Sequence, residues 1–392
     1  YERLITPVVE VADVLDLGLG DAGRAATVRF VEPMTGDVVA LRPDITPQIA
    51  RIAATRMAAG YLPTRLCYEG PVTRLNPRAG GQREVLQAGI ELVDAPSPSG
   101  DAEALAVAAA ALEATLLTEV RLDLGHVAFP RFAMENCPPE RRAELEQALM
   151  RKDRSSAAAI AESMPRAARP VVRALPTLFG PRQEVLDRVR KMRLPRELQR
   201  AVAELESVLE LSAAEVPGTL HRRISLDLGE VRGFDYYTGL RFRGFADGVG
   251  QAVLRGGRYD ELVGRYGRDA AATGFGIDVE AVAEALDVGG IAAPGRGRGL
   301  LIVVSDAKRR RAQSIAAALR ARGHRVLVQV SAPKQARAVA ERGRADGWSH
   351  VLVGNRSWNG SNGARARKLD AAATSAAAGR PAALERWLTG GD

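Results

Sequence analysis

The chain has 392 residues, a hydrophobic content of 46% and a formal net charge of +8. This length exceeds that of one ordinary domain and predicts two or three. No run of about 18 apolar residues occurs, which excludes a conventional membrane-spanning helix. The two cysteines, Cys67 and Cys137, stand far apart in no metal-binding or redox spacing. We therefore expect a cytoplasmic protein with free thiols and with no metal or other cofactor.

The positive charge is concentrated in the C-terminal quarter. Residues 296–392 carry 19 Lys and Arg against 6 Asp and Glu, so the rest of the chain is mildly acidic. Two interpretations remain open: contact with nucleic acid, or a solvated arginine-rich surface. The run Lys308-Arg309-Arg310-Arg311 is expected to begin a helix, where its charges oppose the helix dipole.

The N-terminal part is predicted to contain a helix fragment, a hairpin and a longer helix. Alternating residues at 27–31 and the run 38–41, joined by a turn, predict two antiparallel strands. The segment L-R-P-D-I-T-P-Q-I-A-R-I at 41–52 is typical of a loop that leads into a helix. Thr46 can cap that helix, and Pro47 can occupy its first position.

Two further strands are predicted at 65–69 and 84–93, because apolar and polar residues alternate there. The intervening segment 76–82 is polar and glycine-bearing, which indicates a loop. Apolar residues at helical spacing predict a helix over 101–117, and a strand follows at 119–124.

Residues 130–216 are charged, alanine-rich and interrupted by prolines, which predicts a helical insertion. Strands resume at 224 and continue to 254. Beyond a Pro/Gly-rich linker, strands and helices alternate over 300–353, which favours a small α/β domain with a largely parallel sheet. The predicted organisation is a first domain at 1–293 with the insertion at 130–216, a linker at 294–299 and a C-terminal domain at 300–392.

A first group of polar residues lies on the strand predicted at 84–93. Gln87 and Glu91 are four residues apart, so a strand places both on one face. Such an amide and carboxylate can hold an ammonium group. Arg74, just after the preceding strand, can bind a carboxylate or phosphate in bidentate fashion. A polar outer sheet face is the alternative explanation.

Two more motifs follow: R-G-F-D-Y-Y-T-G at 232–239 and R-G-G-R-Y-D at 255–260. In the first, two tyrosines flanked by Asp and Arg suit a small polar ring; a half-buried strand that ends in a turn would also produce the pattern. In the second, paired glycines permit close approach of a ligand or a neighbouring strand; a plain turn is the alternative.

Taken together and in this order, the motifs resemble class II aminoacyl-tRNA synthetases of the histidyl branch over most of residues 1–290. The C-terminal domain is similar to an anticodon-binding domain. The resemblance implies an α+β fold, with an antiparallel sheet flanked by helices, a helical insertion and a small C-terminal α/β domain. It also implies a histidine-binding pocket formed by Asp44, Thr46, Arg74, Gln87, Glu91, Arg232, Tyr236 and Tyr237.

Three departures from the synthetase pattern fall in the part that binds ATP. By the resemblance, Val85 replaces a phenylalanine that stacks on adenine. Gly81 and Ala281 replace arginines that contact ATP. Removing one preorganised donor to developing charge costs about 10²–10³ in rate. We therefore expect no catalytic residues and little or no activation of an amino acid by ATP.

Synthetase-like chains that keep the pocket but lose activation include the regulatory subunit of short-form ATP phosphoribosyltransferase. The segment L-R-P-D-I-T-P-Q-I-A-R at 41–51 resembles that family, because synthetases carry Glu-Gly-Thr in place of residues 44–46. The resemblance implies a non-catalytic subunit that activates the short catalytic subunit and mediates histidine feedback in the first step of histidine biosynthesis. It also implies a homodimer core within a hetero-oligomer, without tRNA. The alternatives are an active histidyl-tRNA synthetase and a pseudo-synthetase that serves as a tRNA sensor or adaptor.

Overall fold

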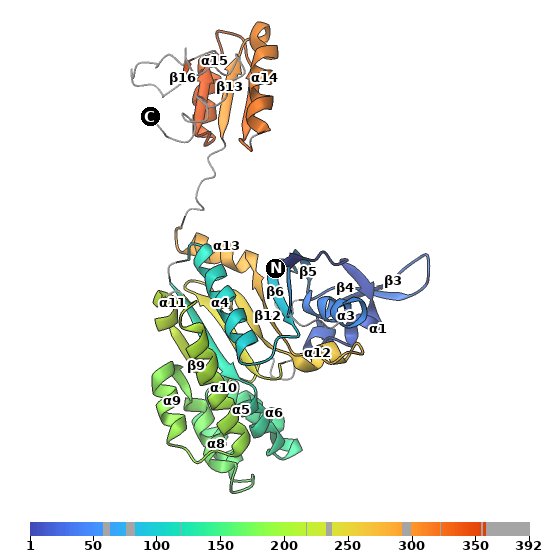
Figure 1. Ribbon diagram of the computed structural model, residues 1–392, viewed down its shortest axis with the longest axis vertical. Coiled ribbons are helices and arrows are strands. Elements are labelled where there is room, and N and C mark those ends of the chain that lie inside the picture. The colour runs from blue at the N-terminus through green and yellow to red at the C-terminus, as the bar shows by residue number, and fades with distance from the viewer. Residues whose placement is uncertain are drawn as a thin grey trace. The chain divides into compact units, whose positions relative to one another are not determined.

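The computed structural model describes residues 1–57, 63–75, 83–117, 119–216, 218–232, 237–291, 299–321, 323–353 and 356–357. The chain divides into two compact units, Tyr1–Ile291 and Ala292–Asp392. Each unit is drawn in Figure 1 and is described by itself below. Of the linker predicted at 294–299, only Gly299 lies within the described residues. No helix in the described part of the chain is long and apolar enough to cross a membrane.

A nine-stranded mixed sheet forms the frame of the first unit (Figure 1). In spatial order its strands are β1 (Glu2–Arg3), β5 (Thr64–Thr73), β6 (Glu84–Val93), β12 (Ala272–Asp278), β11 (Leu254–Arg258), β10 (Leu240–Ala246), β7 (Val120–His126), β9 (Ile224–Asp227) and β8 (Phe179–Pro181). From β5 to β7 every neighbouring pair is antiparallel. The pairs β1–β5 and β7–β9 are parallel.

One face of the central strands is covered by helix α4 (Ser99–Ala114), which packs against β6, β10, β11 and β12. Its Leu105 and Leu112 are fully buried. A Cβ at Gly244 of β10 would lie 2.9 Å from Cδ1 of Leu112, so a glycine lets the helix approach the sheet. Helix α13 (Val279–Val288) follows β12 directly and packs against β6.

A three-stranded sheet lies at the N-terminal side of the first unit. Its strands are β2 (Val9–Val11), β4 (Val38–Leu41) and β3 (Val28–Val31), in that order. The antiparallel pairing of β3 with β4 confirms the predicted hairpin. The short helices α1 (Ala12–Asp16) and α2 (Asp21–Ala25) precede it, and α3 (Thr46–Arg56) packs against α12 (Asp260–Gly264).

The predicted start of α3 is wrong by one residue. Ile45 occupies the N-cap position, no side chain caps the helix, and Pro47 is its second residue. The hydroxyl of Thr46 donates instead to the buried carboxyl of Glu91, at 2.6 Å. A buried carboxyl has no water to bond with, so it competes strongly for a neighbouring hydroxyl.

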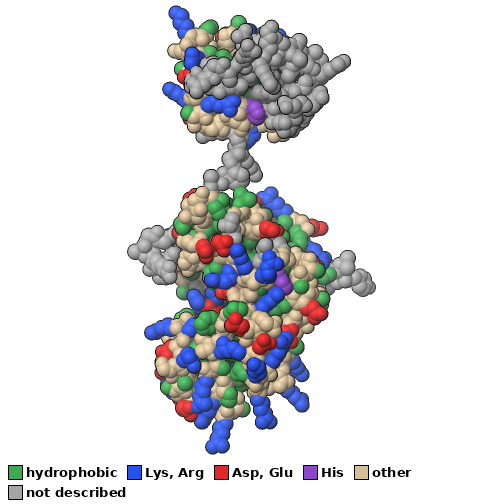
Figure 2. Space-filling model, turned by 90° about the vertical axis from the view of Figure 1, so that its left-hand side faces the viewer, with side chains coloured by type: hydrophobic (Ala, Val, Ile, Leu, Met, Phe, Trp, Pro, Cys, Tyr) green, Lys and Arg blue, Asp and Glu red, His purple; other side chains and the backbone are tan. Residues whose placement is uncertain are grey.

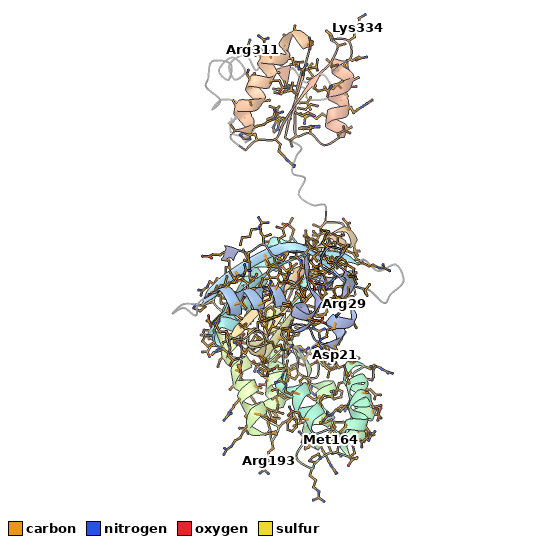
Figure 3. The ribbon with its side chains drawn as sticks, turned by 90° about the vertical axis from the view of Figure 1, so that its right-hand side faces the viewer. Asp21, Arg29, Met164, Arg193, Arg311 and Lys334 are labelled. Carbon is orange, nitrogen blue, oxygen red and sulfur yellow. The ribbon has the colours of Figure 1, made fainter. Side chains whose placement is uncertain are left out.

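The predicted insertion is mostly helical, as expected. Its helices are α5 (Ala128–Glu135), η1 (Pro139–Arg141), α6 (Arg142–Met150), α7 (Arg154–Ala161), α8 (Arg169–Ala174), η2 (Leu175–Thr177), α9 (Arg182–Arg190) and α10 (Arg196–Ser212). Helix α11 (Gly218–Arg222) follows the insertion. The short strand β8 was not predicted; it pairs with β9, and its Pro181 is tolerated because β8 lies at the sheet edge. Arg193 extends from this part of the unit (Figure 3). Basic and acidic side chains are interspersed over its surface (Figure 2).

The described residues of the C-terminal unit form a four-stranded sheet between two helices. The strands are β14 (Val326–Val330), β13 (Leu300–Val304), β15 (His350–Val353) and β16 (Arg356–Ser357), in that order, and η3 (Asp306–Lys308), α14 (Arg309–Arg320) and α15 (Ala336–Ala345) complete it. All pairs except β15–β16 are parallel, so the predicted largely parallel sheet is confirmed. Every residue of β13 is buried, which is typical of a central parallel strand. Arg311 and Lys334 extend from the surface of this unit (Figure 3).

Candidate ligand-binding site

A cavity of about 640 Å³ lies over strands β6, β10, β11 and β12 of the first unit. The polar residues that the sequence selected gather around it, although they come from four separate segments. Seven of the eight line it: Asp44, Thr46, Arg74, Gln87, Glu91, Arg232 and Tyr237. The eighth, Tyr236, lies outside the described residues. The structure thus brings these residues together, and their role as a histidine site stays a prediction.

The floor of the cavity holds a buried acid, Glu91, which is 1% exposed. The hydroxyl of Thr46 donates to one carboxyl oxygen at 2.6 Å, and the hydroxyl of Tyr259 donates to the other. Burial raises the pKa of Glu91 to about 8, although these two hydrogen bonds act to lower it. Glu91 is therefore largely protonated and neutral at pH 7.

Beside Glu91, Gln87 connects the sheet to the loop before α3. Its amide oxygen accepts from the backbone N–H of Ile45 at 3.2 Å, and its amide nitrogen donates to Asp44 at 3.1 Å. The same Asp44 oxygen accepts from the backbone N–H of Thr46 at 3.3 Å. These bonds fix an amide and a carboxylate at one end of the cavity, which we call the acidic end.

Two glycines of β12 leave the space that these polar side chains occupy. Gly274 is paired with Glu91, and a Cβ there would collide with a carboxyl oxygen of Glu91. A Cβ at Gly276 would lie 2.6 Å from the amide nitrogen of Gln87. Sequence reasoning missed both glycines. The alternation G-F-G was visible at 274–276, but its meaning depends on the register with β6.

At the other end of the cavity, Arg232 forms a two-pronged ion pair with Glu230. The Nε and Nη2 atoms of Arg232 donate to the two carboxylate oxygens at 3.0 and 2.8 Å. Arg243 also donates to Glu230. Burial alone would raise the pKa of Glu230, but the two arginines outweigh it and lower the pKa to about 2. Arg232 is 61% exposed, so it is held in place without being shielded from a ligand.

Three further arginines line this end, and sequence reasoning did not assign them to the site. Arg241 and Arg243 alternate with Phe242 along β10, so both side chains leave the same face of the sheet. Arg255 of β11 is the direct cross-strand partner of Arg243. The alternation L-R-F-R at 240–243 is the signal that could have predicted them.

The hydroxyl of Tyr237 is influenced by charges at both ends of the cavity. Burial raises the pKa of its hydroxyl, the charge of Asp44 raises it further, and the charge of Arg241 acts in the opposite direction. The hydroxyl therefore lies within range of the acidic end and of the arginines. An aromatic ring with a polar tip in that position can pack against a small polar ring.

The residues predicted to have lost contact with ATP are placed as follows. Val85 lines the cavity, whereas Ala281 is 1% exposed in the hydrophobic core and does not line it. The Asp278 carboxylate lines the cavity and caps α13 by accepting from the backbone N–H of Ala281 at 2.9 Å. The predicted loop residue Gly81 lies outside the described residues. This part of the cavity therefore presents the carboxylate of Asp278 and the apolar side chain of Val85.

The motif at 255–260 divides between the two faces of the sheet. Arg255 and Tyr259 line the cavity, whereas Arg258 is buried on the far side. Arg258 donates to Asp101 at 2.9 Å, to Asp260 at 2.8 Å and to the carbonyl of Ala95 at 2.9 Å. Its role is structural. Across the described residues, no cluster of three or more His, Cys, Asp or Glu side chains could hold a metal ion.

Comparisons with known proteins agree with this geometry. Residues 1–282 match the family model described as histidyl-tRNA synthetase. A crystal structure from Bacillus halodurans, described as an ATP phosphoribosyltransferase regulatory subunit/histidyl-tRNA synthetase, has a TM-score of 0.74 at 25% identity and covers 90% of this chain and 89% of that one. Histidyl-tRNA synthetase from Nostoc has a TM-score of 0.73 at 20% identity and covers 91% and 86%, which supports the fold alone. The expected α+β, class II synthetase-like fold is confirmed.

The fold and the cavity therefore define a histidyl-tRNA synthetase-like protein. Within that class, the ATP phosphoribosyltransferase regulatory subunit of Geobacter sulfurreducens is 42% identical over 325 residues, which cover 82% of this chain and 73% of the relative. The same-named protein of Anaeromyxobacter dehalogenans is 44% identical over 320 residues, which cover 80% of this chain and 89% of the relative. The chain belongs to the family of ATP phosphoribosyltransferase regulatory subunits, and the prediction of a regulatory rather than a catalytic chain is confirmed.

Proposed function

We propose that this chain activates the catalytic subunit of ATP phosphoribosyltransferase and makes it responsive to histidine, which binds in the cavity. The observation that carries the proposal is a contrast between the acidic end of that cavity and the start of helix α13. The acidic end is fully assembled by hydrogen bonds among Asp44, Gln87 and Glu91 with their neighbours. Ala281, in contrast, is buried in the core where the synthetases carry an ATP-binding arginine.

The cavity offers groups for each part of a histidine molecule. Asp44, the Gln87 amide and Glu91 supply acceptors for the ammonium group. Arg74 and Arg232 supply donors for the carboxylate. The ring of Tyr237 provides an aromatic wall for the imidazole. Binding there would shift the activity of the partner by a coupling free energy of typically about 1–3 kcal/mol.

We further propose that the chain forms a homodimer core inside the hetero-oligomer, in the cytoplasm. Val9 and Val11 of β2 and Val38 of β4 are 42–51% exposed, and apolar side chains gathered on one small sheet favour association. The two free cysteines, Cys67 and Cys137, agree with a reducing compartment.

Histidine binding is tested by isothermal titration calorimetry of the full chain and of the Gln87→Ala variant. Gln183→Ala is the matched control, because Gln183 is an exposed glutamine of α9 far from the cavity residues. We expect Gln87→Ala to weaken binding at least about tenfold, since it leaves Asp44 and the Ile45 N–H without their partner. Equal affinity in the two variants would place the histidine site elsewhere.

Association is tested by sedimentation of the chain with and without the short catalytic subunit of the same organism. We expect a complex whose phosphoribosyl transfer depends on this chain and is inhibited by histidine. A catalytic subunit that is fully active alone, or no complex at micromolar concentrations, would refute the proposal.

The alternative of an active synthetase is tested by histidine-dependent ATP–pyrophosphate exchange, with a genuine histidyl-tRNA synthetase as positive control. We expect no exchange above background. Salt-dependent binding of tRNA by the chain would instead support the sensor or adaptor.

A further inference from the structure

The arginine end of the cavity contains more positive charge than its surroundings balance. Arg241 and Arg243 on β10 and Arg255 on β11 form what we call the arginine face. Arg243 and Arg255 are directly opposite each other on neighbouring antiparallel strands. Like charges in that relation destabilise a sheet. Although Glu230 pairs with Arg243, a bound anion would stabilise such a pair on the wall of a cavity further.

The nearby carboxylates are already engaged. Glu230 is shared by Arg232 and Arg243. Asp278 acts electrostatically on Arg255 from the cavity wall and also caps α13. Desolvation in the cavity wall, followed by the charge of Arg74, lowers the pKa of Arg255 although its side chain reaches solvent.

Arg241 is the deepest member of the arginine face. It is 6% exposed, and one Nη donates to the backbone carbonyl of Arg232 at 3.1 Å. Its Nε atom has no hydrogen-bond partner among the described residues. A Cβ at Gly125 of β7 would lie 3.2 Å from this Nε, so a glycine leaves the room that the guanidinium occupies. Burial, followed by the charge of Arg243, lowers the pKa of Arg241 to about 10.

We propose that the arginine face of Arg241, Arg243 and Arg255 binds the pyrophosphate group of a phosphorylated small molecule. The site lies at the arginine end of the cavity and does not depend on histidine being the ligand at the acidic end.

The spacing of the arginines favours pyrophosphate over a carboxylate. Arg241 and Arg243 are two residues apart on one strand, which separates their Cα atoms by about 7 Å. Arg255 stands about 5 Å across from Arg243. A carboxylate has two oxygens, which one guanidinium can engage in bidentate fashion. A pyrophosphate spreads its negative charge over more oxygens and a greater length, so it can contact all three arginines.

The pyrophosphate group could belong to a nucleotide or to a ligand that has no base, and the cavity wall favours one of the two. The wall offers little free aromatic surface for a base, because Val85 stands where the synthetases are expected to stack adenine. Phe242 and Phe275 line the cavity but are 1% and 4% exposed, and the ring of Phe245, which also lines it, is covered by Arg121 and Arg243. We therefore expect inorganic pyrophosphate to bind about as tightly as ATP, and inorganic phosphate to bind more weakly.

The test is calorimetric titration of the full chain with inorganic pyrophosphate, inorganic phosphate and ATP at low ionic strength. The decisive variant is Arg255→Gln, because Arg255 is exposed and hydrogen-bonds to no acid among the described residues. We expect it to raise the Kd for pyrophosphate at least about tenfold. Arg255→Lys, which keeps the charge without the two-pronged geometry, should recover part of the affinity. Added salt should weaken binding.

Arg121→Gln is the matched control. Arg121 of β7 and Arg243 both lie over the Phe245 ring, at 5.8 and 5.7 Å, but Arg121 does not line the cavity. We expect the Arg121→Gln variant to bind pyrophosphate with the same Kd as the unchanged chain. Absence of pyrophosphate binding at about 10 mM, or an equal loss in Arg121→Gln and Arg255→Gln, overturns the proposal. A much tighter ATP complex that Arg255→Gln also weakens would keep the site and assign it to a nucleotide.

The two proposals fail separately. Arg255→Gln should retain histidine binding, because Asp44, Gln87 and Glu91 are unchanged. Loss of histidine binding in Gln87→Ala, with pyrophosphate binding retained, would likewise show two subsites in one cavity.

Discussion

Replacing Glu91 by glutamine should stabilise the protein, and the gain should grow with pH. The carboxyl of Glu91 is 1% exposed, and burial raises its pKa to about 8 from an ordinary value of 4.5. Glutamine has nearly the same shape, can keep bonds to Thr46 and Tyr259, and cannot ionise. It therefore removes the titration and leaves most of the packing in place.

The sign follows from comparing the folded and unfolded chains. Below about pH 4.5 Glu91 is protonated in both, so its titration has no effect on stability. Between about pH 4.5 and about pH 8 the unfolded chain loses the proton and the folded chain keeps it, and the free energy of unfolding falls by about 1.4 kcal/mol per pH unit. At pH 7 the accumulated loss is about 3 kcal/mol, which Glu91→Gln avoids. Above about pH 8 the difference levels off.

The assay is urea denaturation of both proteins from about pH 5 to about pH 9, followed by far-UV circular dichroism. Tryptophan fluorescence is unsuitable, because Trp348, Trp358 and Trp387 all belong to the second unit. Glu84→Gln is the matched control, since Glu84 is exposed at the start of the same strand. A difference between Glu91→Gln and the unchanged protein that stays constant across this pH range would refute the assigned pKa and the reasoning built on it.

Three further predictions test the cavity wall. Gly274→Ala should cost about 1–3 kcal/mol and abolish histidine binding, because its Cβ would collide with Glu91; urea denaturation and calorimetry measure both effects. Ala281→Arg should not restore ATP–pyrophosphate exchange and should lower the urea midpoint markedly, because it places an unpaired charge in the core. Arg255→Gln should raise the stability of the ligand-free protein by about 0.2–1 kcal/mol at low salt, since it relieves repulsion from Arg74 and Arg243, and thermal melts at two salt concentrations check this. A destabilised Arg255→Gln would contradict the like-charge argument.

Local patterns were sufficient for much of the fold. The alternation at 84–93 predicted that Gln87 and Glu91 share a face, and both line the cavity. The continuous apolar run Leu300–Val304 predicted a buried strand between helices, because a central parallel strand is covered on both faces. In each case, one segment of sequence contains the information that decides the structure.

The rest depends on partners distant in sequence. Thr46 has the residue type and position of a helix cap, but an acceptor 45 residues away takes its hydroxyl. Gly274 is needed because the strand register places it opposite Glu91, whose carboxyl occupies the space of a Cβ. Arg243 and Arg255 meet only because β10 and β11 pair in one alignment. Such pairings follow from the sheet topology, which no single segment of the sequence specifies.

Two buried arginines of the same sheet show how differently the fold treats its core and its cavity. The side chain of Arg258 is 4% exposed and meets two carboxylates and a backbone carbonyl, so its charge is balanced where it is buried. Arg241 is about as deep, but its hydrogen bond among the described residues is to a carbonyl. The charge of Arg243 opposes its own, and Glu230 and Asp227 attract it only through their charge. A buried charge without a partner costs several kcal/mol unless something compensates it. Because the fold gives Arg258 direct carboxylate partners, it is able to supply them to buried arginines. Among the described residues no carboxylate hydrogen-bonds to Arg241 in the cavity wall, which indicates a position that a ligand completes.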